Sequence, residues 1–451
     1  MNSPTAAARG RRAWLGTSLC ALMCITAHAA PPASEPLPDP LTLDYALSLA
    51  ATPDPDVQAA QADVALARAQ QQDAAADSGV QAAVQGRAFR ADPTRVAIDQ
   101  GREDSSISLV VRKPLFDFGR GRAGEVAAQD ELRGSELRLL EAQQQRRLNI
   151  MACYFDVLLA DLAVARDDAA LALAEHIFKS AVARTQLGQI SRIDRGAAED
   201  KFLAAKRQQL VSAARLRATR TTLADTLNKP GQLPATLSVP EFKVLDRAVP
   251  PLETLLDKAQ TQNPLLLAQR SRIDAALQRI QAARAQRLPV LNGELAASNY
   301  SRQTDERDNW HAGVTLEMPL YTGGRTQAAI AARRAELQRA EAEYAQARQT
   351  LTQVLQTALD DIATLQVQRE QARVQLEYRT LALERSRGLH GNTQDDTVDA
   401  DRAALAAARL FRAQTDYQLA LTWARLDALL GGQADPAALI GEAAIPLPLK
   451  N

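Results

Sequence analysis

The sequence predicts a mostly helical fold that also contains membrane-type β-strands, arranged as a duplicated helix–hairpin–helix unit. Three observations support this prediction. Long stretches of the chain lack both Gly and Pro, shorter stretches alternate apolar and polar residues, and the same motifs recur in the same order about 205 residues later.

The composition favours long helices and excludes several classes of protein. The 451 residues hold 53 Lys plus Arg and 53 Asp plus Glu, and this zero net charge argues against nucleic-acid binding by bulk charge. Aromatic residues make up only 4%, which is low for the core of a compact enzyme, and much of the apolar 46% is Ala, the best helix former. Three Cys, 21 Gly and 21 Pro exclude a disulfide scaffold and a collagen-like chain.

The N-terminus has the pattern of an export signal. Residues 9–12 hold three Arg, residues 14–26 are apolar, and Ala27-His28-Ala29 is an A-x-A cleavage sequence. The apolar run is short for a membrane span, which needs about 20 residues. We therefore expect residues 1–29 to be a cleaved signal peptide and Cys153 to be the one Cys of the mature chain. No other stretch of 18 apolar residues is expected, so no helical membrane span is predicted.

Internal matches indicate that the chain contains two copies of one unit. Three pairs of segments match in the same order, at offsets of 209, 205 and 203 residues. This period is far too long for a solenoid repeat, so it indicates a duplicated unit. The matching pairs are 43–47 with 252–256, 113–120 with 318–325, and 223–227 with 426–430.

The two copies define the expected domain organisation. The first repeat is expected at 41–228 and the second at 252–432, with a Pro-rich linker at 229–251 and a C-terminal tail at 433–451. Each repeat is expected to hold one hairpin followed by two long helices. The expected hairpins are at about 80–113 and 289–318, and the expected long helices are at about 119–187, 192–228, 324–389 and 396–430.

The longest helical stretch, residues 325–387, has 63 residues without Gly or Pro. Globular helices rarely exceed about 25 residues, and longer ones usually form coiled coils. At about 1.5 Å per residue this helix would reach roughly 95 Å. Apolar residues recur in it at helical spacing, as at Leu351, Val354 and Leu355, so the sequence predicts helices packed side by side.

Between the helical stretches, period-two alternation predicts four strands. Ile107, Leu109 and Val111 alternate with polar neighbours, and residues 310–318 repeat the pattern in the second half. Strands of this length with one apolar and one polar face are typical of transmembrane barrels. Two ordinary hairpins in a soluble protein would give the same alternation. Tyr300 and Trp310 flank the second hairpin tip, where membrane-interface aromatics occur.

Four strands cannot close a barrel, because the open sheet edges would remain unpaired in lipid. Several chains must therefore combine, and three chains would give twelve strands, an allowed even number. No catalytic or metal-binding pattern is visible, since His176, His311 and His390 lie far apart and Cys153 lies in an apolar helical context. We expect no cofactor, no metal and no enzymatic activity.

The order of these motifs resembles the TolC family of outer-membrane efflux proteins, over about residues 41–432. The resemblance implies a homotrimer with a twelve-stranded outer-membrane β-barrel continued by a long periplasmic α-helical barrel. It also implies a passive exit duct for a tripartite efflux or type I secretion system, surrounded by outer-membrane lipid. The implied partners are a periplasmic adaptor and an inner-membrane ABC or RND transporter. The matching segments are 114–120, 188–194, 263–264, 319–325 and 396–400.

The strand-to-helix junctions carry the residues that such a transition requires. Pro114 and Pro319 are expected to end strand pairing, because Pro lacks an N–H. Gly119, Gly323 and Gly324 provide backbone angles that other residues avoid. An ordinary loop would explain the same residues.

An acidic cluster follows the longest helix, at Asp395, Asp396, Asp399 and Asp401. Asp396 and Asp399 are three residues apart and so share one helix face. In the TolC family two acidic residues with this spacing line the closed periplasmic entrance. Capping of the last helix is the other explanation. In a trimer these two residues would bring six carboxylates near one axis, raise one another's pKa and attract cations.

Asp194 matches a family position whose polar contacts help to keep the entrance closed. The Tyr and Arg that usually accompany it are missing here, so Arg192, Arg385 or Arg387 would have to replace them. The second hypothesis for the whole chain is a periplasmic coiled-coil adaptor or structural protein, and an enzyme is the third. An adaptor would show a lipoyl-like β-domain around one helical hairpin, whereas this sequence predicts two. The exported substrate cannot be read from the sequence.

Overall fold

We describe a computed structural model of the chain, which covers residues 37–52, 54–93, 95–96, 99–302, 307–390 and 396–432. For His390 it describes the backbone alone. The predicted signal peptide, the predicted tail at 433–451 and Asp395 lie outside the described residues.

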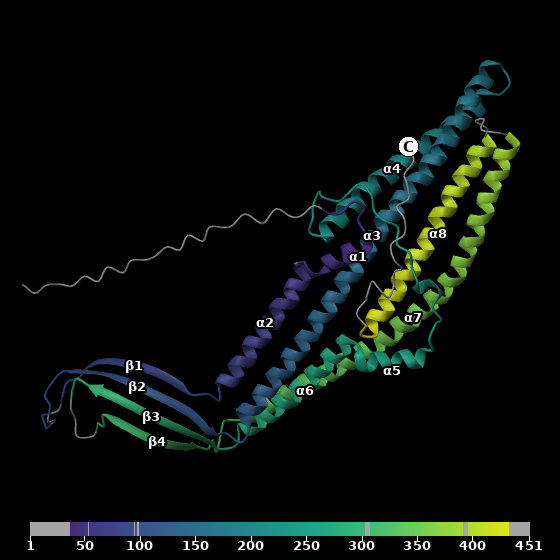
Figure 1. Ribbon diagram of the computed structural model, residues 1–451. Coiled ribbons are helices and arrows are strands. Elements are labelled where there is room, and N and C mark those ends of the chain that lie inside the picture. Colours follow the sequence, from purple (N-terminus) through teal and green to yellow (C-terminus); the bar gives the residue numbers. More distant parts are fainter. Residues whose placement is uncertain are drawn as a thin grey trace, which may run out of the picture. The chain divides into compact units, whose positions relative to one another are not determined.

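The first half of the chain forms short helices, a β-hairpin and two long helices, in that order (Figure 1). The longest of them, α3, has 67 residues. The elements are α1 (Leu43–Ser48), η1 (Leu49–Ala51), α2 (Pro55–Ala76), β1 (Gln81–Arg90), β2 (Glu103–Phe116), α3 (Arg120–Gln186) and α4 (Arg192–Thr226).

The second half repeats this order, and its long helix α7 has 66 residues. A short turn of 3₁₀ helix, η2, lies in the segment between the halves. The elements are η2 (Val244–Asp246), α5 (Leu252–Gln262), α6 (Pro264–Ala285), β3 (Val290–Tyr300), β4 (Trp310–Glu317), α7 (Arg325–His390) and α8 (Asp396–Leu429).

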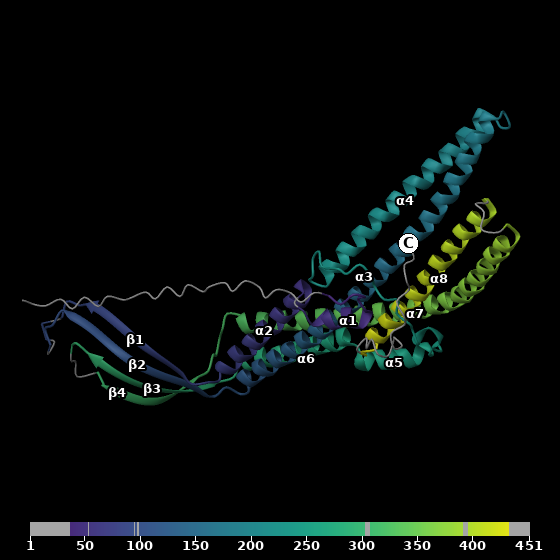
Figure 2. The same ribbon diagram turned by 45° about the horizontal axis from the view of Figure 1, so that its top comes forward.

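The long helices lie side by side in a fixed order. Away from the sheet, α3 packs against α4 and α8, and α8 packs against α7, which gives the order α4-α3-α8-α7 (Figure 1). Nearer the sheet, α3 packs against α2 and α6, and α6 packs against α7, which gives the order α2-α3-α6-α7 (Figure 2). In the order α4-α3-α8-α7, the helices α4 and α7 are therefore the two edges.

The largest apolar core lies where α1, α3, α5, α7 and α8 meet the segment between the halves. Trp423 and Tyr154 are its largest fully buried side chains. The Tyr154 hydroxyl lies 2.8 Å from the Leu41 carbonyl oxygen and 2.7 Å from that of Ser238. Burial raises the pKa of Tyr154 to about 12. This hydroxyl therefore stays neutral and attaches both the N-terminal segment and the inter-repeat segment to α3.

The core-facing part of α3 corrects one prediction from the sequence. Contrary to the expectation that no further stretch is long and apolar enough, α3 contains an 18-residue window that could cross a membrane by length and composition. Of this window, 44% is buried inside the protein, as also occurs in core helices of soluble proteins. The apolar residues are concentrated there because α3 packs against several other elements, with Ile150, Met151 and Leu158 in the core.

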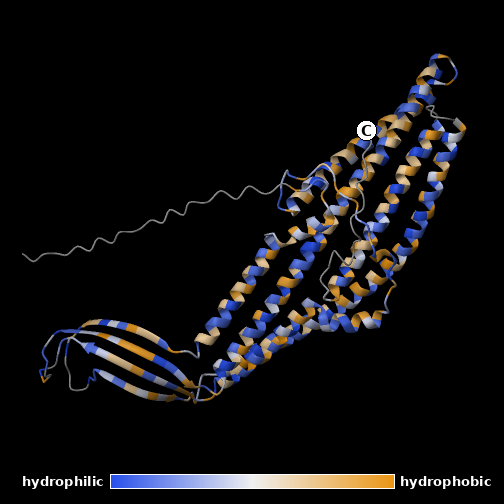
Figure 3. Ribbon diagram, viewed as in Figure 1, coloured by the Kyte–Doolittle hydropathy of each residue, from blue (hydrophilic) through white to orange (hydrophobic). Residues whose placement is uncertain are grey.

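The four strands form one antiparallel sheet in the order β1-β2-β3-β4. The hairpins β1–β2 and β3–β4 are therefore joined through β2 and β3, which belong to different halves of the chain. The strands β1 and β4 are the two edges. In Figure 3, hydrophobic and hydrophilic residues alternate along the strands, as the period-two pattern predicts.

Candidate functional site

The strand register aligns the apolar residues of all four strands on one face of the sheet. Val84 pairs with Leu109, Leu109 with Ala297, and Ala297 with Trp310. Directly paired residues of antiparallel strands point to the same side. Leu109 is 49% exposed and Trp310 68% exposed, so nothing in the described part of the chain covers this apolar row. A contiguous exposed apolar face marks a surface made for lipid or for another protein.

The opposite face of the sheet is polar and internally bonded. Arg112 Nε donates to Glu294 Oε2 at 2.6 Å, and His311 Nε2 lies 3.4 Å from Glu294 Oε1. Ser298 and Ser108 form a hydroxyl hydrogen bond of 2.8 Å. Such contacts make this face suited to contact with water, and the two faces together have the polarity of a membrane barrel wall.

At the first junction, Asp117 attaches the strand end to the start of α3. Its carboxylate accepts from the amides of Gly119 at 3.0 Å and Gly121 at 2.6 Å. Gly119 has a φ of 80°, which suits Gly. Sequence reasoning named Gly119 as a junction residue and missed Asp117, although an Asp just before a helix is a known capping pattern.

Pro114 does not end its strand, contrary to the prediction. It lies within β2, which continues to Phe116 with a bulge between Pro114 and Phe116. The pairing of β1 with β2 stops at Arg112, so no β1 partner requires an N–H at Pro114. This explains why Pro is tolerated in a strand that lies inside the sheet.

The second junction differs from the first. β4 ends at Glu317, two residues before Pro319, so here the strand stops ahead of the Pro. Gly323 and Gly324 have φ angles of 61° and 82° and lead directly into α7, which begins at Arg325. Both glycines therefore adopt left-handed backbone angles that favour Gly.

At the N-terminal end of α8, the two predicted entrance carboxylates have different environments. Asp396, in the first turn of α8, is exposed, and its Oδ1 lies 3.3 Å from Nε2 of His176 on α3. Asp399 is buried, and its Oδ1 accepts from Arg402 at 2.9 Å. Within one chain, then, Asp396 pairs with another helix and Asp399 pairs with its own.

The sequence analysis did not identify a further polar contact near the start of α8, between two side chains of different helices. The buried Ser386 hydroxyl of α7 donates to Asp401 of α8. Leu383, Val398 and Leu405 form a small apolar cluster between the same two helices. The end of α7 and the start of α8 are thus held together by contacts of their own.

Asp194 lies at the start of α4, where it completes a capping box with Ser191. Asp194 Oδ2 accepts hydrogen bonds from the Ser191 amide at 3.1 Å and from the Ser191 hydroxyl at 2.8 Å. In return, the Asp194 amide donates to the Ser191 hydroxyl oxygen at 3.1 Å. The hydrogen bonds from Ser191 lower the pKa of Asp194. These contacts are all local to the first turn of α4.

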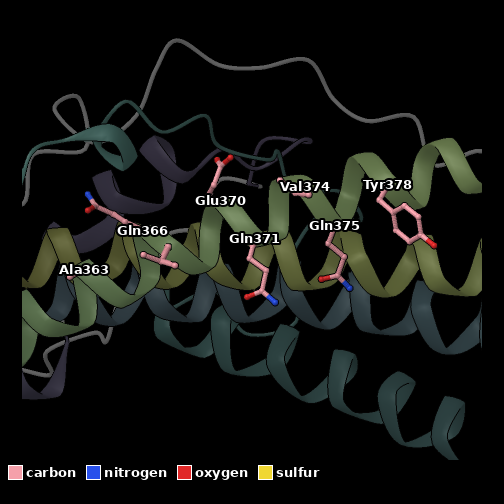
Figure 4. Close-up of a pocket in the computed structure, with 8 residues that line it drawn as sticks. Ala363, Gln366, Glu370, Gln371, Val374, Gln375 and Tyr378 are labelled. Carbon is pink, nitrogen blue, oxygen red and sulfur yellow. The ribbon is translucent and has the colours of Figure 1, made fainter.

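The edge helix α7 presents an exposed groove along one of its faces (Figure 4). Val367 is 74% exposed, Val374 52% and Tyr378 59%, all at helical spacing. Gln366, Gln371 and Gln375 are also among the side chains drawn around the groove in Figure 4.

Other candidate chemistry is limited in the described part of the chain. There, no group of three or more His, Cys, Asp or Glu side chains could hold a metal ion. Cys153 is half-buried, with its sulfur 3.6 Å from the Thr226 hydroxyl. Burial raises the pKa of its thiol, which disfavours the reactive thiolate.

Comparison with known proteins shows which proteins the chain is similar to. Residues 255–432 match the family model described as outer membrane efflux protein. The outer membrane efflux protein BepC of Brucella suis is 26% identical over 264 residues, covering 57% of this chain and 56% of BepC. The outer membrane protein TolC of Vibrio cholerae is 33% identical over 118 residues, covering 24% of this chain and 25% of TolC. The chain thus covers less than two thirds of either relative.

The fold is similar to that of solved outer-membrane channels. The crystal structure of the Campylobacter jejuni CmeC outer membrane channel has a TM-score of 0.70 at 16% identity, covering 96% of this chain and 95% of that one. These comparisons confirm the resemblance to the TolC family of outer-membrane efflux proteins. They also confirm the predicted location, the outer membrane, with a large helical part in the periplasm.

Proposed function

We propose that this protein is the passive exit duct of a tripartite efflux or type I secretion system in the outer membrane. One observation carries the proposal: a four-stranded sheet with an exposed apolar face, a polar opposite face and two open edges. A water-soluble adaptor would leave the apolar row of Leu109 and Trp310 in water. In a barrel wall the same row faces lipid.

The duct is a homotrimer in this proposal, because one chain provides four strands and open edges are not tolerated in lipid. Three chains give twelve strands, with β4 of one chain beside β1 of the next. The edge helices support the same arrangement, since α4 exposes Leu203, Leu210 and Val211. The groove of α7 with Val367 and Val374 is the matching apolar face, so α4 and α7 of neighbouring chains close the helical barrel.

The end of the helical barrel where α8 begins is the periplasmic entrance in this proposal. Asp396 and Asp399 of three chains line its constriction, and Asp194 adds a closed-state contact at the neighbouring turn. The partners are a periplasmic adaptor and an inner-membrane ABC or RND transporter, which supplies the energy. The duct itself performs no chemical reaction and needs no cofactor.

Membrane fractionation and single-channel recording test this function. We expect the protein in the outer-membrane fraction as a trimer that forms pores in planar bilayers. A disulfide between Cys substitutions at Leu210 of α4 and Val367 of α7 would link neighbouring chains. Recovery as a monomer in the soluble periplasm, without pores, would exclude the duct.

The entrance is tested separately, with the double variant Asp396→Ala/Asp399→Ala. Removing six carboxylates from the trimer should reduce cation selectivity and weaken block by multivalent cations. Glu336→Ala/Glu341→Ala, which removes the same number of carboxylates from exposed sites on α7 outside the groove, is the matched control. Unchanged selectivity and unchanged block in the Asp variant would exclude the proposed constriction.

A further inference from the structure

The apolar face of the sheet contains a hollow near the strand ends that lead into α3 and α7. Its volume is about 420 Å³. Seven of its ten lining residues belong to the apolar face, because they alternate with the polar residues and pair with one another across the strands. One row of the register holds Lys113, Gly293 and Val314, the next row holds Val111, Leu295 and Ala312, and Val80 lies just ahead of β1.

Small residues at two of these positions create the hollow. Gly293 has no side chain and Ala312 has only a methyl group, whereas Leu295 and Val314 on the same face have larger apolar side chains. Leu295 is 50% exposed and Val314 is 62% exposed, so both project from the sheet beside the hollow. On a face that lies in lipid, such a hollow has the shape and polarity to hold an acyl chain.

Lys113 is the one charged residue among these seven, and in the described part of the chain it has no ion-pair or hydrogen-bond partner. Along β2 its neighbours on the same face are Val111 and Leu115. Glu294 of β3 lies on the opposite face, where it is bonded to Arg112 at 2.6 Å. The apolar face therefore carries a cation without a counter-charge on the same face beside it.

The position of Lys113 along β2 places it close to the membrane interface in the proposed duct. It lies three residues before the strand ends at Phe116, which is about 10 Å along the strand at about 3.3 Å per residue. This end leads into α3 and is the periplasmic side. A charge on the lipid face costs least near an interface, and the Lys stem extends its ammonium group toward the headgroups.

We propose that this hollow binds an anionic phospholipid of the periplasmic leaflet, with one acyl chain over Gly293 and Ala312 and the headgroup phosphate on Lys113. The inference rests on the proposed function, because the apolar face must lie in the membrane. Charge complementarity selects the occupant, since an apolar hollow lies beside a cation that needs an anion. A second copy of the chain is not the occupant, because neighbouring copies meet at the edge strands β1 and β4, whereas Lys113 lies on β2.

Native mass spectrometry of purified, delipidated trimers measures this binding. Phosphatidylglycerol supplies an anionic headgroup with acyl chains, phosphatidylcholine supplies the chains with a zwitterionic headgroup, and inorganic phosphate supplies the anion alone. We expect phosphatidylglycerol to bind more tightly than phosphatidylcholine, and inorganic phosphate not to bind. Lys113→Gln should weaken phosphatidylglycerol binding about fivefold, the effect of one Lys beside an anionic lipid surface, and should leave phosphatidylcholine binding unchanged. Lys113→Arg should keep the preference.

The hollow is tested separately from the charge. Ala312→Leu fills it with an apolar side chain and should weaken the binding of both lipids. Ala312 is chosen because a Cβ at Gly293 would lie only 3.2 Å from Leu115 Cδ1. Lys258→Gln removes the same charge from an exposed position on α5, in the helical part, and is the matched control that should bind both lipids as the unmodified protein does.

Equal binding of phosphatidylglycerol by Lys113→Gln and the unmodified trimer would overturn the site, and so would an unmodified trimer that does not prefer phosphatidylglycerol. Inorganic phosphate that binds as tightly as the lipid would exclude a lipid as the occupant. If Lys113→Gln does not assemble, the preference of the unmodified trimer and the loss in Ala312→Leu decide. Absence of trimers and pores would contradict the duct itself, whereas pore-forming trimers without a lipid preference contradict only this site.

Discussion

Arg247 donates to both carboxylate oxygens of Asp427, at 2.9 and 3.2 Å, and this pair attaches the segment between the two halves to α8. The same guanidinium lies 4.8 Å from the centroid of the Trp423 ring, and Gln366 of α7 donates to the Arg247 carbonyl at 3.1 Å. One residue of the linker thus contacts both long helices of the second half. The Pro-rich linker is therefore a structural part of the helical assembly.

Replacing Arg247 with Ala should lower stability. The change removes the ion pair in which Arg247 Nη1 contacts both carboxylate oxygens of Asp427, and the cation–π contact with Trp423, together about 1–2 kcal/mol per chain. The unfolding midpoint in denaturant, followed by the fluorescence of Trp423 and the other Trp residues, should shift to lower denaturant concentration.

Arg373→Ala is the matched control for this measurement. Arg373 pairs with Glu370 and Glu377 of its own helix at the surface, and such pairs contribute little. Its unfolding midpoint should stay close to that of the unmodified protein. Equal midpoints for the two variants would show that the attachment of the segment between the halves to α8 does not depend on Arg247.

Local sequence patterns were enough to predict much of the fold. The first long helix, expected at about 119–187, corresponds to α3, which ends at Gln186 just before Gly188, although Gly121, Gly124 and Gly134 lie inside it. Period-two alternation likewise identified strands such as β4, since it reflects the two faces of a sheet. These signals are contained within a few neighbouring residues.

Pairs between distant elements could not be predicted in this way. The contact of His176 with Asp396 depends on how α8 packs on α3, and neither residue has a pattern that names its partner. The same holds for Ser386 with Asp401. The prediction that Pro114 ends its strand was wrong because the pairing of β1 with β2 already stops at Arg112, two residues earlier. Where this pairing stops depends on the strand register and not on Pro114 itself.

Replacement of Gly by Ala should have opposite effects at the junction into α7 and inside α3. Gly324→Ala should destabilise by about 1–2 kcal/mol, because a side chain is strained at its φ of 82°. Gly124→Ala, inside α3 with open space around it, should stabilise by about 0.5–1 kcal/mol. Thermal unfolding of the two variants checks the signs. A stabilising Gly324→Ala would contradict the left-handed junction.

The capping box of Asp194 predicts a local dependence on pH. Its pKa in the folded chain lies below the ordinary value of 3.8, so its stabilising effect is present above that value and is lost as the pH falls through the lowered pKa. Hydrogen exchange of the first turn of α4 should therefore gain protection between acidic and neutral pH. Asp194→Asn, compared at each pH, should lack this change, and an identical pH response in the variant would refute the assignment.

Adjacent residues of β1 provide the sharpest test of the barrel wall. Val84 belongs to the apolar face and is 67% exposed, whereas its neighbour Gln85 belongs to the polar face. Val84→Arg should cost about 2–4 kcal/mol if it faces the lipid core, and Gln85→Arg should be tolerated in a water-filled lumen. The fraction of assembled trimer in the outer membrane should fall for the first variant alone. Equal assembly of both would contradict the assignment of the two faces, because only a lipid-facing position penalises the charge.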